Sequence, residues 1–164
     1  MMTIDWDLVF AATNGIAVTG WLALALLPRR EPVGGGVLWL GVGLLCAAYL
    51  AMLTGLLGGL VDPGRMAGGA EVPFEYTVDG LIAAFGARGV MVLGWTHYLA
   101  FDLFVGLWIA LDADRRSVGR VAQLPFFLAT FLAGPVGLLA WLLLRRAFGK
   151  AVRHSTDKLA RSAD

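Results

Sequence analysis

Four long apolar runs, separated by polar segments, dominate the pattern of hydrophobic and polar positions along the chain. The runs cover about residues 8–27, 37–61, 90–111 and 121–144. A helix needs about 20 apolar residues to cross a bilayer core of about 30 Å, so each run is long enough to span a membrane. The pattern predicts an all-α integral membrane protein with four transmembrane helices in a bundle.

The polar segments mark where these helices end. Pro28 and Pro32, with charged residues between them, close the first run. The longest polar segment, residues 62–89, opens with a turn signal at Asp62-Pro63-Gly64. We expect an extramembrane loop between the second and third helices, ending in an interfacial helix over residues 77–87, because about 11 residues cannot cross the core.

Composition supports a membrane protein and excludes some functions. The chain is 59% hydrophobic and 15% charged, whereas soluble domains are about 25% charged. We assign residues 1–144 to the transmembrane domain and 145–164 to a polar, basic tail. A net charge of +1 without a basic groove motif argues against a nucleic-acid partner. The single cysteine, Cys46, lies within an apolar run and is read as a small packing residue.

Basic residues do not fix the orientation of a four-span chain. Four spans place both termini on one side of the membrane. The Lys and Arg residues on that side number eight: Arg65, Arg88, Arg145, Arg146, Lys150, Arg153, Lys158 and Arg161. The other side has five: Arg29, Arg30, Arg115, Arg116 and Arg120. Cytoplasmic segments are richer in basic residues, although tails count less than short loops. The balance favours cytoplasmic termini only weakly.

The third run carries two polar residues, His97 and Asp102. A charged aspartate at the centre of a span costs about 2.5–3.5 kcal/mol, so Asp102 should face the bundle interior. No Lys or Arg lies inside any span. We therefore expect Asp102 to be protonated or bonded to another polar side chain. The candidates for that bond are Tyr98, Asn14, Thr54 and Thr130.

Helical geometry places these two residues on different faces. A separation of five residues gives about 140° of rotation and about 7.5 Å of rise, which is poor for a direct hydrogen bond. Neither a protease-like His–Asp dyad nor a one-face metal site is supported, and we predict no metal. A structural role stands beside a functional one for each: hydrogen bonding within the bundle for Asp102, and an interfacial position for His97.

The fourth run contains the sequence Gly134-Pro135-x-Gly137. A proline inside a helix removes one backbone donor and frees the carbonyl four residues earlier, here that of Phe131. Two interpretations follow: a kink that serves packing only, or a kink that opens a cavity beside the third helix. We expect any site to lie between the third and fourth helices.

Several of these residues together resemble a known family. Trp95-x-His97-x-Leu99-x-x-Asp102-Leu103-Phe104, then Asp112, Leu124, Phe131 and Gly134-Pro135-x-Gly137, is similar to the abscisic-acid-deficient-type-4 family. The resemblance covers residues 95–144. Plant members are plastid membrane proteins required to make the carotenoid neoxanthin. The chain shows no plastid transit peptide, which fits a bacterial relative, and we expect it in the bacterial inner membrane.

The resemblance implies a role in carotenoid or isoprenoid metabolism. In plants the reaction converts violaxanthin to neoxanthin, an isomerisation that opens an epoxide to an allene. It needs an acid at oxygen and a base at carbon, and His97 and Asp102 match the polar positions of the family. We expect these two residues to be catalytic. The candidate substrate-binding residues are Trp95, Tyr98, Phe101, Phe104, Trp108, Phe131 and Pro135.

A non-catalytic carotenoid- or lipid-binding protein, or a scaffold, is the alternative to an isomerase. A groove lined by Phe101, Phe104 and Trp108 would be enough for it. Membrane lipids and an apolar molecule such as a carotenoid are the expected partners, and a second copy of the chain is a further candidate. No cofactor is indicated. A transporter is less well supported, because the chain has one intramembrane Asp and no inverted repeat.

Overall fold

A computed structural model describes residues 1–28, 31–64 and 75–161. Helices make up the secondary structure of these ranges, apart from isolated β-bridge residues at Met2, Val61 and Ala87, of which Met2 pairs with Val61. The all-α prediction is therefore confirmed.

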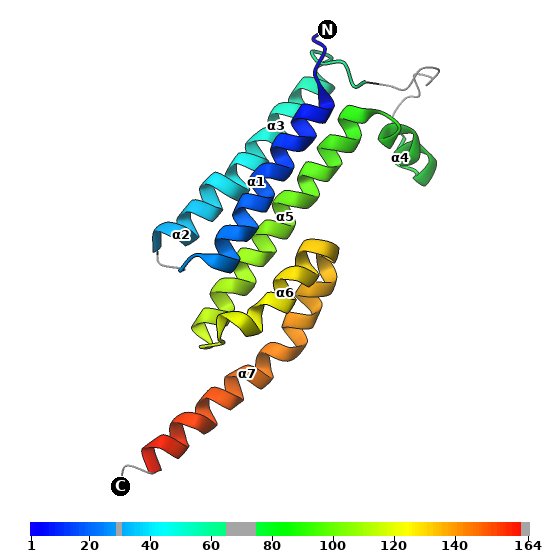
Figure 1. Cartoon of the computed structure of the whole chain (residues 1–164). Coiled ribbons are helices and arrows are strands. Elements are labelled where there is room, and N and C mark those ends of the chain that lie inside the picture. The colour runs from blue at the N-terminus through cyan, green and yellow to red at the C-terminus, as the bar shows by residue number, and fades with distance from the viewer. Residues whose placement is uncertain (29–30, 65–74, 162–164) are drawn as a thin grey trace. The chain divides into compact units, whose positions relative to one another are not determined.

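Three long apolar helical stretches of the described chain could cross a membrane, as expected of an integral membrane protein. They cover Trp6–Leu26, Val33–Leu57 and Arg88–Arg115. The first is α1 and the third is α5 (Figure 1). The second consists of α2 (Glu31–Gly36), the π-helix η1 (Val37–Gly43) and α3 (Leu44–Leu57).

The fourth apolar run is not one helix, and the predicted four-span count is not confirmed. The helix α6 (Arg120–Ala133) ends before Gly134, and α7 (Pro135–Arg161) begins directly after it. Figure 1 shows α6 and α7 side by side as an antiparallel hairpin. The two helices have 14 and 27 residues. Gly134, with φ 5° and ψ −76°, joins them. At about 1.5 Å per residue, α6 is about 21 Å long and falls short of the bilayer core.

The Gly-Pro sequence explains why the run folds back. Pro135 is the first residue of α7, where a missing backbone donor costs nothing, so the expected proline kink is instead a turn between two helices. At Gly137, a side-chain carbon would collide with the backbone of Thr130. The hydroxyl of Thr130 donates to the carbonyl of Phe126 at 2.7 Å, within its own helix. Gly137 has no side chain, and the hydroxyl of Thr130 already has a hydrogen-bond partner within its own helix. The two helices can therefore lie in direct contact at this point.

The chain forms two compact units, and α1 and α5 contribute to both. The first contains residues 1–19 and 39–101, and the second contains residues 20–38 and 102–164. In the first unit α1, α3 and α5 lie side by side (Figure 1). A buried cluster joins these helices to the segment after α3, and its members are Trp6, Met52, Val61 and Val92.

In the second unit, large side chains fill the space beside small ones. Trp141 of α7 is fully buried. Trp21 lies against Gly106, where any side-chain carbon would collide with the indole ring. The ring of Trp21 also lies 6.1 Å from that of Phe127 and 5.9 Å from that of Phe131, measured between centroids. These contacts pack α1, α5 and α6 together within this unit.

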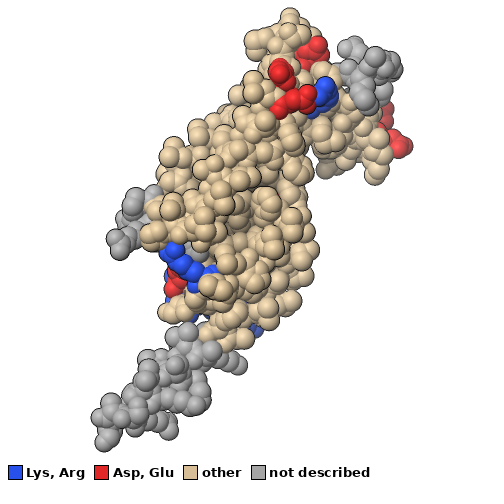
Figure 2. Space-filling view, viewed as in Figure 1, with Lys and Arg blue, Asp and Glu red and all other residues tan. Residues whose placement is uncertain are grey.

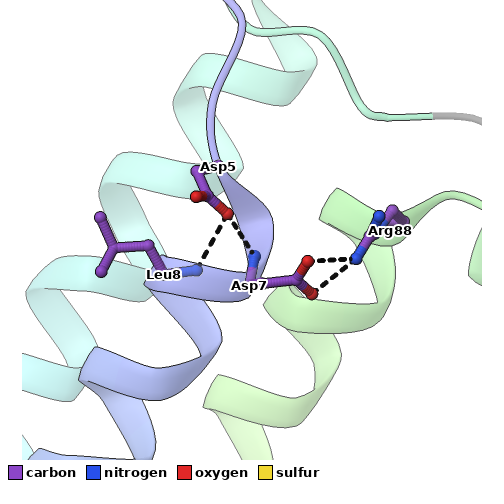
Figure 3. A network of polar contacts seen from close by, with 4 residues as sticks. All are labelled: Asp5, Asp7, Leu8 and Arg88. Carbon is purple, nitrogen blue, oxygen red and sulfur yellow. Dashed lines mark hydrogen bonds and ion pairs between the residues drawn. The ribbon is translucent and has the colours of Figure 1, made fainter.

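Charged residues stabilise the start of α1. Asp5 precedes the helix and accepts hydrogen bonds from the backbone N–H groups of Asp7 (3.0 Å) and Leu8 (3.1 Å). Asp7 pairs with Arg88 at the start of α5, as Figure 3 shows. On the face drawn in Figure 2, charged side chains of the first unit gather at this end, next to a long uncharged surface. An uncharged surface is what a membrane-embedded helix presents to lipid.

Replacing Asp5 by alanine should destabilise the protein by about 1 kcal/mol, because two N–H groups of α1 lose their acceptor. Thermal unfolding in detergent, followed by circular dichroism, measures the loss. The control is Asp7→Ala, which removes a side chain that is 78% exposed in its ion pair. Exposed pairs contribute little, so an equal or larger effect of Asp7→Ala would contradict the capping role.

The connection between the second and third long helices contains the predicted short helix, here α4 (Val78–Phe85). Thr77 caps it, since its hydroxyl accepts the backbone N–H of Gly80 at 3.0 Å. Residues 65–74 of the predicted loop lie outside the described residues. Arg88, at the end of the loop, forms an ion pair with Asp7.

Candidate functional site

The predicted site residues fall into two groups along or beside α5. Those in the first unit are Trp95, His97, Tyr98 and Phe101. Those in the second unit are Asp102, Phe104, Trp108, Phe131 and Pro135. Each group has its own neighbours.

In the first unit, His97 is part of an aromatic row. Its ring is stacked on that of Phe101, with centroids 4.6 Å apart and an interplanar angle of 26°. Tyr49 of α3 lies on the same ring, with centroids 5.6 Å apart. His97 and Phe101 are exposed and Tyr49 is half-buried. The row therefore presents a polar, proton-carrying ring among aromatic side chains on the surface of the helices.

Trp95 and Tyr98 form a second aromatic row with α1. Their rings are stacked with centroids 5.8 Å apart, and Phe10 lies 6.0 Å from Trp95. The indole N–H of Trp95 donates to Oδ1 of Asn14 at 3.2 Å. Asn14 in turn donates to the carbonyl of Phe10 at 2.7 Å. Trp95 and Tyr98 thus contact different side chains from His97 and Phe101, which divides the predicted binding residues of this unit into two surfaces.

In the second unit, Asp102 lies against the turn of the hairpin. Its side chain is in close contact with Gly134, where an added side-chain carbon would collide with the carboxyl oxygen Oδ1. Asp102 is 8% exposed, and Gly134 is buried as well. The turn between α6 and α7 is therefore covered by the carboxyl group, which would have to move to admit a side chain at position 134.

The remaining predicted residues of this unit have other neighbours. Phe131 packs on Trp21, while Trp108 lies under the guanidinium of Arg145, 5.7 Å from its ring centroid. Phe104 is exposed. Pro135 begins α7 and serves the turn.

Asp112 forms a polar cluster whose contacts were not predicted. Its Oδ2 accepts hydrogen bonds from Arg116 (3.0 Å), from the indole N–H of Trp141 (3.0 Å) and from Arg145 (3.3 Å). The cluster ties the end of α5 to α7. The sequence shows only that an aspartate, a tryptophan and arginines stand at the ends of two apolar runs. It does not indicate which of these residues contact one another.

In the described part of the chain, no three His, Cys, Asp or Glu side chains are grouped so that they could hold a metal ion.

Three long apolar helices and a helical hairpin with a buried carboxyl at its turn define a polytopic membrane protein. A family model described as ABA DEFICIENT 4-like matches residues 8–141, and the chain belongs to this family. Membership suggests a role related to neoxanthin or carotenoid synthesis. No curated protein and no solved structure matches the chain.

Proposed function

We propose that the protein isomerises a carotenoid or related isoprenoid within the membrane, with His97 and Asp102 as its acid and base groups. The two residues lie on different faces of α5, about 140° apart, so one substrate meets both only if it wraps around the helix or the helix distorts. The observation that carries the proposal is the exposed row of His97, Phe101 and Tyr49. In a membrane, side chains on such a surface meet lipid-soluble molecules. Family membership supports a carotenoid among them.

The row suits a long conjugated molecule. The flat faces of Phe101 and Tyr49 can pack on a polyene, since aromatic side chains contribute large apolar contact areas. His97, in contact with both, supplies an imidazole, the side chain that most often transfers protons in enzymes. The row therefore combines a binding surface and a proton carrier on α3 and α5.

The chemistry of an epoxide-to-allene isomerisation needs no redox partner. A base removes a proton from a carbon of the polyene, the electrons form the allene and the C–O bond of the epoxide breaks. An acid delivers a proton to the oxygen, which becomes a hydroxyl, so atoms and electrons balance. A carboxylic acid can serve as such an acid, and the proposal gives this role to Asp102, whose side chain is buried.

The test uses violaxanthin as the probe and membranes that contain the full chain. We expect conversion to neoxanthin, measured by chromatography, and a loss of about a hundredfold or more in rate for His97→Gln and for Asp102→Asn. Both variants should still bind pigment. The control is Thr19→Val, because Thr19 is exposed and its hydroxyl bonds the carbonyl of Gly15 at 2.8 Å.

Each variant can fail separately. Full conversion by Asp102→Asn would remove the role of this carboxyl, and full conversion by His97→Gln would remove that of the imidazole. Loss of rate in Thr19→Val would show that the assay reports folding only.

A non-catalytic carotenoid-binding protein is the second candidate. The burial of Asp102 favours this function. Its side chain is 8% exposed and packs against Gly134, which is a structural role. The aromatic row alone would then hold the ligand. Violaxanthin that co-purifies with the chain and stays unchanged on incubation would support this function over the enzyme.

A further inference from the structure

We infer that α6 and α7 form a re-entrant hairpin, which enters the membrane and leaves it on the side where α5 ends. The chain then crosses the membrane three times, and its two termini lie on opposite sides. This inference concerns topology and does not depend on the proposed reaction.

The depth of the hairpin follows from its contacts with α5. Its tip, Gly134, touches Asp102. Its outer part returns to Asp112, where Trp141 and Arg145 of α7 both bond the carboxylate. Asp102 and Asp112 are ten residues apart, which is about 15 Å along a helix, or half of a bilayer core of about 30 Å. The tip thus reaches about the middle of the membrane.

The ends of the hairpin lie at the level where α1 and α5 end. Arg120, the first residue of α6, donates to the carbonyl of Leu27, just after α1, at 2.9 Å. Arg145 and Arg116 meet at Asp112 near the end of α5. Charged groups gather where a chain leaves the hydrocarbon core, so these contacts place both ends of the hairpin at one interface.

The backbone of the hairpin meets the conditions for a turn at membrane depth. Non-helical backbone is tolerated within a bilayer only where protein covers it. Gly134 and Gly137 are buried, and the side chain of Asp102 lies on the turn. The polar side chains of α6 are also covered, since Thr130 and Gln123 are fully buried.

The re-entrant hairpin also places most of the Lys and Arg residues on one side of the membrane. Three spans leave two basic residues, Arg65 and Arg88, on the side of the N-terminus. The other eleven of the 13 fall on the opposite side: Arg29, Arg30, Arg115, Arg116, Arg120, Arg145, Arg146, Lys150, Arg153, Lys158 and Arg161. Four spans would divide them eight to five. Cytoplasmic segments carry the excess of Lys and Arg, so the C-terminus is cytoplasmic and the N-terminus is on the other side.

Cysteine labelling in cells tests the topology. Cys46→Ser removes the only cysteine, and single cysteines are then introduced by Thr3→Cys, Gly119→Cys and Ser155→Cys. At Gly119 a new side chain meets nothing within 4 Å. A membrane-impermeant maleimide should label Thr3→Cys in intact spheroplasts, and Gly119→Cys and Ser155→Cys only after lysis. Labelling of all three in detergent is the control for reactivity.

The outcomes separate the two topologies. A re-entrant hairpin requires positions 119 and 155 to behave alike and position 3 to differ. Equal labelling of positions 3 and 155 would overturn the inference, and labelling of position 119 opposite to both would establish four spans. Positions 119 and 155 both labelled from outside would keep the hairpin but overturn the cytoplasmic assignment.

Discussion

Replacing Trp141 by alanine is expected to cost about 3–5 kcal/mol of stability, which is the usual range for losing a buried tryptophan. Trp141 is fully buried and packs edge-on against Phe126, with ring centroids 5.2 Å apart. Its indole N–H also bonds Asp112, which would keep two arginines but lose this donor. The substitution therefore leaves a cavity and weakens the link between α5 and α7.

Thermal unfolding in detergent, followed by circular dichroism, measures the effect. Trp39→Ala is the matched control, because Trp39 lies in a long apolar helix but is 73% exposed. Surface substitutions generally stay within about 0.5 kcal/mol. Equal losses for the two variants would contradict the buried role of Trp141.

Gly137→Ala should destabilise the hairpin by about 1–3 kcal/mol, the range for overpacking a tight contact. The new carbon would lie 2.7 Å from Cα of Thr130, and a backbone atom cannot move aside as a side chain can. Helix propensity works the other way, since alanine in a helix interior is favoured over glycine by about 0.5–1 kcal/mol. The sign of the change in the free energy of unfolding therefore shows whether the helix contact or the helix propensity dominates at this position.

The control for this prediction is Gly15→Ala in α1. Nothing lies within 4 Å of the position that its new side chain would take. Propensity should then act alone and raise the unfolding temperature. If Gly137→Ala also raised it, the close approach of α6 and α7 would be refuted.

The three long helices could be predicted from the sequence because hydropathy is a local property. The first predicted run, residues 8–27, differs from α1 by two residues or fewer at each end. The third, residues 90–111, lies within α5. Such agreement needs no knowledge of what the helices touch.

The hairpin could not be predicted in the same way. Residues 121–144 are apolar enough to read as one span, and nothing local distinguishes a proline kink from a turn. The choice is made by contacts between distant residues, such as Asp102 with Gly134 and Trp21 with Phe131. The sequence Gly134-Pro135 indicates a kink when only the proline is considered.

In the candidate site, too, some features follow from the local sequence and others depend on packing between helices. Periodicity separated the face of His97 from that of Asp102, and their neighbours in the structure differ accordingly. Tyr49 as a neighbour of His97 was not predicted, because the register between α3 and α5 depends on packing rather than on either helix alone. The catalytic roles of His97 and Asp102 stay predictions.

The short length of α6 has a consequence for how the protein is made. The 14 residues of α6 cannot be inserted as a stable span, and the turn after it needs side chains from elsewhere to cover it. Those side chains come from α1 and α5, which the ribosome makes first: Trp21 against Phe131, and Asp102 against Gly134. The side chains that cover the hairpin are therefore available only once α1 and α5 have been made.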